Sequence, residues 1–266
     1  MESFQLESLD TLSSAFNRDG YVVIRGAVPK DLLRDFHARV TAEFDRTRAS
    51  GQLFAGGGSI SGHLNCFPGE ETRIIYDLLE QRGLIDMVRK LHPKSKLAPN
   101  VGCNFNLPGS VAQHYHPDGL YVKDFSILNV AVVDTTLENG AIDVLPGTHQ
   151  RFYRFYQYAL ERQYKRSTRV PLNQGDVLFR ISNLWHRGMP NRTSVPRPML
   201  AFTWEDGGRE GDPFKFNDGK IRFLQNWYRS NLVGRLRERT FVAAPITYSA
   251  VRFVRSLYSD RGYSAW

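Results

Sequence analysis

The stretch "AQHYHPDGLY", residues 112–121, brings two histidines and one aspartate together in a chain of 266 residues that has seven histidines in all. His116 and Asp118 are two positions apart, so on an extended segment both side chains point to the same side. A second histidine would complete a set of two histidines and one carboxylate, which leaves three positions open on non-haem Fe(II) for a co-substrate and O2. By itself the pair is a weak signal, because a lone His-x-Asp more often forms a turn.

The segment "GDVLFRISNLWHRGMPNRT", residues 175–193, supplies that histidine. His186 ends a strand-like run 70 residues after His116, which leaves enough chain for several strands to return it to the first pair. Arg197 follows 11 residues later, and an arginine can pair with both oxygens of one carboxylate of 2-oxoglutarate, whose other end chelates iron. Alone, His186 would fit the core and Arg197 a strand surface. Their order predicts a site for Fe(II) and 2-oxoglutarate.

Two other histidines compete for the metal. His114 and His116 together resemble the opening of a cupin metal motif, and "GAIDVLPGTHQ", residues 140–150, nearly matches the second cupin motif and offers His149. The glutamate that the first cupin motif needs does not follow, so we interpret His114 as a neighbour of the site and His149 as a turn residue. A cupin-type jelly-roll metal-binding protein without 2-oxoglutarate chemistry is the alternative.

The elements that must position these residues change in character along the chain. Apolar residues recur at helical spacing over 9–16, 32–44 and 74–91, with a break at Gly83, and "GYVVIRG" (20–26) reads as a strand. Residues 49–69 are rich in glycine and serine and predict a long mobile loop.

From about residue 97 the chain consists of short β segments separated by glycine, proline and asparagine, interrupted by a helical pattern over 149–167 and followed by helical character from about 217. This pattern predicts a mainly β sandwich or barrel with flanking helices, in a single domain over residues 1–266. The run "FSILNVAVVDT" (125–135) is apolar at almost every position, which predicts a central strand buried on both faces.

Composition narrows the class of protein. A hydrophobic fraction of 41% is ample for a packed core, and the start of the chain has no basic and apolar secretory signal. No apolar run reaches the roughly 20 residues that span a bilayer. The only cysteines, Cys66 and Cys103, are too few for a disulfide framework, so we expect a cytoplasmic protein.

The formal charge of +8 is concentrated in arginines near the C-terminus, from Arg222 onward. The simplest interpretation is a solvated face of amphipathic helices. The alternatives are attraction to an anionic substrate, a peripheral contact with a membrane surface, or binding to nucleic acid. We rank nucleic acid last, because no recognised nucleic-acid module accompanies the arginines.

Several blocks together resemble the phytanoyl-CoA hydroxylase-like family of Fe(II)/2-oxoglutarate-dependent oxygenases. They are "FNRDGYVVIRGAVPKDLL" (16–33), "QHYHPD" (113–118), "ENGAIDVLPGTHQ" (138–150) and the His186 segment with its arginine. The resemblance implies a double-stranded β-helix (jelly roll) and a dioxygenase that releases succinate and CO2. It also implies iron held by His116, Asp118 and His186, with 2-oxoglutarate bound by Arg197 and contacted by Gln113. Relatives that halogenate replace the carboxylate, so Asp118 favours hydroxylation.

The substrate is less well defined by the sequence. Five polar or aromatic residues are candidates to line a pocket, and ordinary packing is the competing interpretation for each: His63, Asn65, Tyr115, Tyr121 and Trp185. We expect a small molecule, either a specialised metabolite or an anionic or acyl-linked compound.

Overall fold

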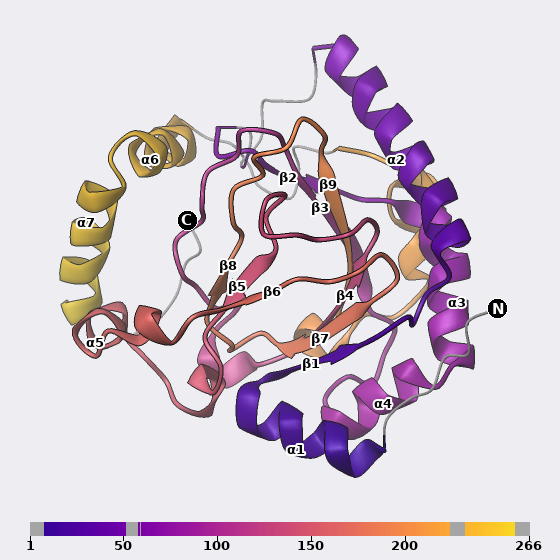
Figure 1. Cartoon of the computed structure of the whole chain (residues 1–266), viewed down its shortest axis with the longest axis horizontal. Coiled ribbons are helices and arrows are strands. Elements are labelled where there is room, and N and C mark those ends of the chain that lie inside the picture. Colours follow the sequence, from indigo (N-terminus) through magenta and orange to yellow (C-terminus); the bar gives the residue numbers. More distant parts are fainter. Residues whose placement is uncertain (1–7, 52–57, 59, 224–231, 259–266) are drawn as a thin grey trace.

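The computed structural model describes residues 8–51, 58, 60–223 and 232–258. Two antiparallel sheets form its centre (Figure 1). The larger has the strand order β1-β7-β4-β9-β3-β2 and the smaller the order β6-β5-β8. The strands of the larger sheet are β1 (Tyr21–Ile24), β2 (His63–Cys66), β3 (Asn100–Asn106), β4 (Ser126–Ala131), β7 (Val177–Ile181) and β9 (Arg197–Thr203). Those of the smaller are β5 (Ile142–Val144), β6 (Thr168–Val170) and β8 (His186–Arg187).

Strand β4 lies in the middle of the larger sheet, between β7 and β9. All six of its residues are buried, as its uninterrupted apolar sequence predicts. The strands of this sheet are far apart in sequence, so its register fixes which distant side chains share one face.

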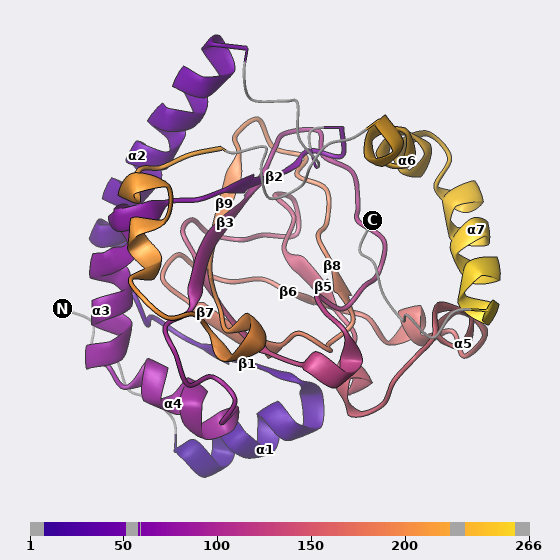
Figure 2. The same cartoon turned by 180° about the vertical axis from the view of Figure 1, so that it is seen from behind.

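Four helices cover one side of the larger sheet, and Figures 1 and 2 both show them together. They are α1 (Leu9–Asp19), α2 (Lys30–Ala49), α3 (Arg73–Gln81) and α4 (Leu84–Leu91). Their apolar stripes enter one core with the sheet, where the rings of Phe16 and Phe179 stack at 4.7 Å. Gly83 separates α3 from α4 with φ +76°, a conformation that costs a glycine little. The predicted helices and the break between them are therefore confirmed.

Three helices lie on another side of the molecule, α5 (Phe155–Leu160), α6 (Leu232–Ala243) and α7 (Pro245–Tyr258) (Figure 2). The helix predicted over 149–167 is largely wrong, because only α5 is α-helical there and it is flanked by short 3-10 turns. Among the described residues, the 3-10 turns are Gly69–Thr72, Tyr121–Lys123, Thr148–Gln150, Gln163–Arg166, Glu205–Gly207 and Pro213–Gly219. Within the described part of the chain, no helix combines the length and apolar character needed to span a membrane.

The loop predicted over 49–69 contains a strand, which corrects the sequence interpretation. His63–Cys66 form β2 and pair with residues 103–106, the C-terminal part of β3, while residues 52–57 and 59 lie outside the described residues. Leu64 and Cys66 enter the core, whereas His63 and Asn65 line a cavity. The alternation is real, but four residues are too short a run to stand out beside the surrounding glycines.

Candidate active site

A pair of backbone hydrogen bonds joins the two segments that carry the candidate histidines. The amide N–H of His116 donates to the carbonyl oxygen of His186 at 2.8 Å, and the N–H of His186 donates back at 2.8 Å. Two residues on, the N–H of Asp118 donates to the carbonyl of Ser182 at 2.9 Å. This antiparallel bridge brings together side chains that are 70 residues apart in sequence.

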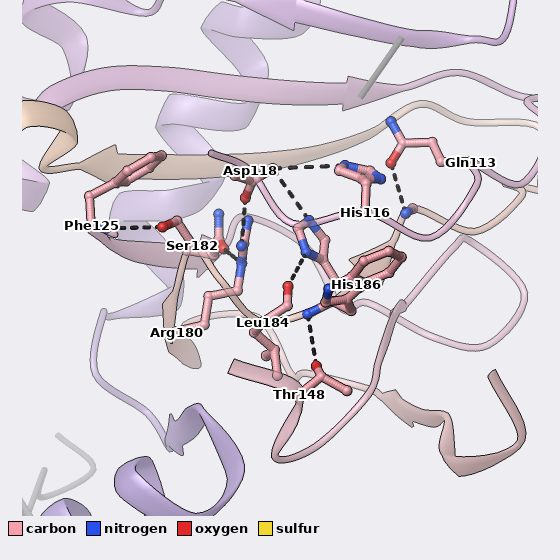
Figure 3. Close-up of polar contacts among 12 residues, drawn as sticks. Gln113, His116, Asp118, Phe125, Thr148, Arg180, Ser182, Leu184 and His186 are labelled. Carbon is pink, nitrogen blue, oxygen red and sulfur yellow. Dashed lines mark hydrogen bonds and ion pairs between the residues drawn. The ribbon is translucent and has the colours of Figure 1, made fainter. Parts of the chain in front are cut away.

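Backbone carbonyls also fix the tautomer of both imidazoles. Nδ1 of His116 lies 2.8 Å from the carbonyl oxygen of His114, and Nδ1 of His186 lies 2.9 Å from that of Leu184. A carbonyl oxygen can only accept, so each Nδ1 carries the proton and each Nε2 carries the lone pair. Both Nε2 atoms face Asp118 (Figure 3).

The two oxygens of Asp118 have different neighbours. Oδ1 lies 3.8 Å from Nε2 of His116 and 3.5 Å from Nε2 of His186, whereas Oδ2 lies 2.6 Å from Nη1 of Arg180. Arg180 comes from β7, its side chain is only 8% exposed, and its Nε donates to Oδ1 of Asn129 at 3.2 Å. Figure 3 shows the guanidinium below the carboxylate. One oxygen is thus directed to the histidines and the other is held by a buried cation.

The electrostatics suit a metal site. Burial, reinforced by the nearby imidazole of His186, lowers the pKa of His116 to about 3, so its lone pair is available at neutral pH. Burial opposes ionisation of Asp118, but the guanidinium of Arg180 and the two imidazoles hold the pKa of this carboxyl well below its usual range.

The donor set fits divalent iron. His116, Asp118 and His186 each offer one ligand atom, and these atoms all lie within 4.8 Å of one another. Two neutral imidazoles and one carboxylate oxygen form the facial set of non-haem Fe(II) enzymes. Among the residues that the structure describes, no second group of three such donors is found.

Arg197 is a buried cation in the same cavity. It is 5% exposed, its Nε and Nη2 donate to the carbonyl oxygens of Asn139 and Gly140 at 3.4 and 3.2 Å, and no described carboxylate pairs with it. Burial lowers its pKa to about 10, so it remains charged at neutral pH. Because a buried charge needs compensation, this guanidinium is suited to bind an anion that enters the cavity.

Gln113 and His63 lie against the backbone of Gly188. The N–H of Gly188 donates to Oε1 of Gln113 at 2.8 Å, and Nε2 of His63 donates to the carbonyl of Val111 at 2.8 Å. A Cβ on residue 188 would lie 2.8 Å from Oε1 of Gln113 and 2.9 Å from Cε1 of His63, so any side chain at this position would displace them. Burial lowers the pKa of His63 to about 4, which keeps it neutral.

These residues line one cavity of about 660 Å³, large enough for a co-substrate and a small substrate. Both sheets contribute, with Arg180 and Arg197 from the larger and His186 from the smaller. Helices α6 and α7 also contribute side chains to the wall: Arg235, Arg237, Glu238, Phe241 and Tyr248. Glu238 is 6% exposed and accepts hydrogen bonds from the N–H and hydroxyl of Ser61, both at 2.9 Å.

Three candidate pocket residues lie elsewhere. The described residues that line the cavity do not include Tyr115, Tyr121 or Trp185. The hydroxyl of Tyr115 donates to Asp143 at 2.7 Å, and Tyr115 and Trp185 belong to a second, aromatic core cluster. The ring of Tyr121 lies 5.7 Å from that of Phe152. Strand alternation explains this, because Tyr115 points away from the face that carries His116. His63 and Asn65, in contrast, do line the cavity.

The competing histidines have other neighbours. Nε2 of His149 lies 3.1 Å from the carbonyl oxygen of Asn17 at the end of α1, so His149 joins that helix to the turn after β5. The ring of His114 lies 5.3 Å from that of Phe241 and 5.2 Å from that of Tyr248, against the C-terminal helices. In the described chain, the cupin set of His114, His116 and His149 is not assembled.

Sequence reasoning missed Arg180 and the contribution of α6 and α7. A signal for Arg180 was present, because it is the one charged residue in the run "VLFRI", which is buried throughout. A charged side chain in a fully buried strand requires a partner, and here the partner is the candidate ligand Asp118.

Comparison with known proteins relates the chain as a whole to named enzymes. The sequence pattern of the family described as Phytanoyl-CoA dioxygenase (PhyH) matches residues 16–199. A methylphosphonate hydroxylase of Gimesia maris is 28% identical over 146 residues, which cover 52% of this chain and 56% of that protein. The chain thus spans little more than half the length of this relative. Dioxygenase FrzG of a Cladobotryum species is 25% identical over 219 residues, 70% of each chain.

Among solved structures, the epimerase SnoN in complex with Fe3+, alpha-ketoglutarate and a nogalamycin compound is similar with a TM-score of 0.56 at 19% identity. The match covers 73% of this chain and 82% of SnoN. At this identity the likeness concerns the fold, and it confirms the predicted mainly β, jelly-roll class with flanking helices.

Proposed function

The chain belongs to the phytanoyl-CoA dioxygenase family, and from this premise we propose that it hydroxylates an aliphatic C–H bond of a small molecule with release of succinate and CO2. The family match confirms the predicted enzyme class, an oxygenase that depends on iron and 2-oxoglutarate. The predicted cofactors, iron and 2-oxoglutarate with O2 as the oxidant, are confirmed as well.

We assign the iron to His116, Asp118 and His186. The observation that carries the proposal is the pair of Nε2 atoms with fixed lone pairs, both facing one oxygen of Asp118. Iron bound there would supply the chemistry that oxidises 2-oxoglutarate and the substrate C–H bond with O2. The protein holds the ligands, charges and dry surroundings in place before the reactants arrive.

Arg197 is proposed to bind the far carboxylate of 2-oxoglutarate. Its guanidinium is buried in the cavity and bonded only weakly to two carbonyls, so it can still form a bidentate pair with a carboxylate. Gln113 lines the same cavity, and its side-chain carbonyl already accepts a hydrogen bond from Gly188, so its NH2 group is the part suited to contact the co-substrate.

The remaining lining supports a polar small-molecule substrate. His63, Asn65 and Asn104 offer hydrogen-bonding groups on the sheet side, and Arg235 and Arg237 offer positive charge on the helix side. An anionic substrate is consistent with these arginines. Halogenating relatives have another residue in place of the carboxylate ligand. The presence of Asp118 at this position therefore favours hydroxylation over halogenation.

We also propose that residues 1–266 form one oxygenase domain. Its support is that α6 and α7, far beyond residue 199 where the family match ends, contribute to the wall of the same cavity. Cys66 and Cys103 are buried free thiols, as suits a cytoplasmic protein.

Anaerobic addition of Fe(II) and 2-oxoglutarate tests the assignment. We expect the weak visible charge-transfer band of the iron chelate, its loss in His186→Ala, and its retention in the matched control His149→Ala, whose histidine bonds α1 instead. A band that persists in His186→Ala would contradict the ligand set, and loss in His149→Ala would favour the cupin alternative.

Succinate release tests the reaction itself. A panel of carboxylate, phosphonate, amine, sugar and CoA-linked compounds should include at least one that accelerates succinate formation above the uncoupled rate. Mass spectrometry of that compound should show the addition of one oxygen atom. A loss of two hydrogens instead would identify a desaturase.

A further inference from the structure

Helices α6 and α7 turn their apolar side chains outward. Eight of the 18 large hydrophobic residues that are exposed in the described chain lie within 232–258. Figures 1 and 2 both show the two helices at the rim of the molecule beside α5. The exposed residues are Leu232, Val233, Leu236, Ile246, Val251, Val254, Leu257 and Tyr258, and we call them the α6–α7 face.

The two sides of α7 are clearly different. Its inner side is polar and aromatic, with Tyr248 against His114, Arg252 donating to the carbonyl of Tyr115 at 2.9 Å, and Ser256 accepting from the N–H of Tyr156 at 3.0 Å. At about 100° per residue, the apolar side chains from position 246 to position 258 occupy a continuous arc of about 140° on the outer side. No residue of α7 is buried, so this arc is not part of the core.

Helix α6 repeats the arrangement. Its buried residues, Glu238 and Phe241, face the cavity, and its apolar residues at 232, 233 and 236 form an arc of about 100° on the opposite side. Three exposed arginines flank that arc: Arg239, and the two that also line the cavity, Arg235 and Arg237. Ile246 (85% exposed) begins the same pattern on α7, where Arg255 borders the apolar arc.

The exposed charge on these helices has one sign. Between residues 232 and 258 the only acidic residue is Glu238, and it is buried on Ser61. The exposed charged residues of α6 and α7 are therefore all arginines. An apolar arc bordered by arginines is the pattern of a helix that lies in the interface of a bilayer.

We propose that the α6–α7 face binds the surface of a membrane that contains anionic lipids. The apolar side chains would enter the acyl boundary, and Arg239 and Arg255, which border the arcs and do not line the cavity, would contact the negatively charged headgroups. Since the inner sides of the same helices line the catalytic cavity, binding would bring that wall of the cavity close to the lipid. The inference goes beyond the proposed oxidation and does not depend on it.

Charge makes a second copy of the chain a poorer occupant. A two-fold contact would place the same patch on both partners. The arginines of one copy would then meet those of the other, with no exposed carboxylate between residues 232 and 258 to compensate them.

Sedimentation with lipid vesicles tests the proposal on the full-length protein. We expect binding to vesicles of phosphatidylcholine mixed with phosphatidylserine, weaker binding to phosphatidylcholine alone, and weakening by salt. The double variant Leu236→Glu, Val254→Glu should bind at least about tenfold more weakly. Arg255→Glu should weaken binding to the anionic vesicles only. The matched control is Ile74→Glu, an apolar residue of α3 that is 58% exposed and outside the face.

Several outcomes would overturn the proposal. They are absence of sedimentation with anionic vesicles at low salt, equal loss of binding in the Ile74→Glu control, or a dimer in light scattering that the double variant dissociates while vesicles do not bind. The charge-transfer band of iron and 2-oxoglutarate, recorded in parallel, should be the same in all variants. It separates failure of this proposal from failure of the catalytic assignment and shows that each variant is folded.

Discussion

Arg180 determines how Asp118 faces the two histidines. It holds Oδ2 at 2.6 Å and is itself fixed by Asn129, so Oδ1 is the oxygen left toward the Nε2 atoms. Groups that orient a metal ligand without touching the metal typically contribute 10–100-fold to metal affinity. Arg180 is therefore a positioning residue for the proposed iron site.

Replacement of Arg180 by Gln should weaken binding of Co(II), as a spectroscopic substitute for Fe(II), by about tenfold, because the carboxylate loses its fixed orientation. Optical titration of the Co(II) bands measures the affinity and the ligand geometry together. Arg180→Lys should recover part of the loss, since it restores the charge.

The control is Arg25→Gln, which removes another arginine–aspartate pair, that of Arg25 with Asp176 at 2.5 Å, without altering Asp118. Equal effects of the Arg25 and Arg180 variants would indicate general destabilisation instead of a positioning role.

The sequence indicated the candidate ligands but not the cation that orients one of them. His116, Asp118 and His186 are recognisable because residue type and order carry the signal. The contact of Arg180 with Asp118 depends on the register of β7 against β4, and register is set by packing of the whole sheet. The same limit applies to Tyr115 and Trp185, whose residue types suited a pocket but whose strand faces turn them into a separate core.

At the scale of elements, long periodic segments were predictable and short ones were not. The helices α1 to α4 and the buried strand β4 follow directly from their apolar spacing. Strand β2 has four residues and α5 has six, so neither has enough turns or alternations to be distinguished from loop. Their formation depends on partners distant in sequence, such as β3 for β2.

Helix α6 is fixed to the body by Glu238. This buried carboxylate accepts two hydrogen bonds from Ser61, 177 residues away in sequence. Replacement by Ala would leave the buried N–H of Ser61 without its acceptor, which costs about 1–3 kcal/mol. We expect faster amide hydrogen exchange throughout α6 in Glu238→Ala, measured by mass spectrometry.

Glu238→Gln keeps an acceptor oxygen and should exchange much more slowly than the alanine variant. Exchange in α2, which packs on the other side of the sheet, should be unchanged in both. Uniform acceleration over the whole chain would instead indicate global unfolding and contradict a local role for Glu238.

At the scale of the whole molecule, burial favours the neutral form of most of the histidines. Burial lowers the pKa of six of the seven: His37, His63, His92, His114, His116 and His149. Two of these, His63 and His116, line the cavity, and His114 packs against the rings of Phe241 and Tyr248. Composition alone could not reveal this, because the same histidines on a surface would have ordinary pKa values.

These lowered pKa values predict acid destabilisation of the metal-free protein. Below its usual pKa of 6.5 each histidine binds a proton in the unfolded chain, whereas the folded chain resists protonation, so the unfolded state binds more protons and stability falls as pH falls. For His63, whose folded pKa is about 4, the loss of folding stability accumulates between roughly pH 6.5 and 4 and reaches on the order of 3 kcal/mol.

Denaturant unfolding in the presence of a chelator, repeated at intervals from pH 7.5 to 4.5, should show this decline in stability. His63→Gln removes one titrating group but keeps a donor for Val111, so its stability should decline less steeply with acid. Parallel curves for the variant and the unmodified protein would show that His63 is not among the groups responsible.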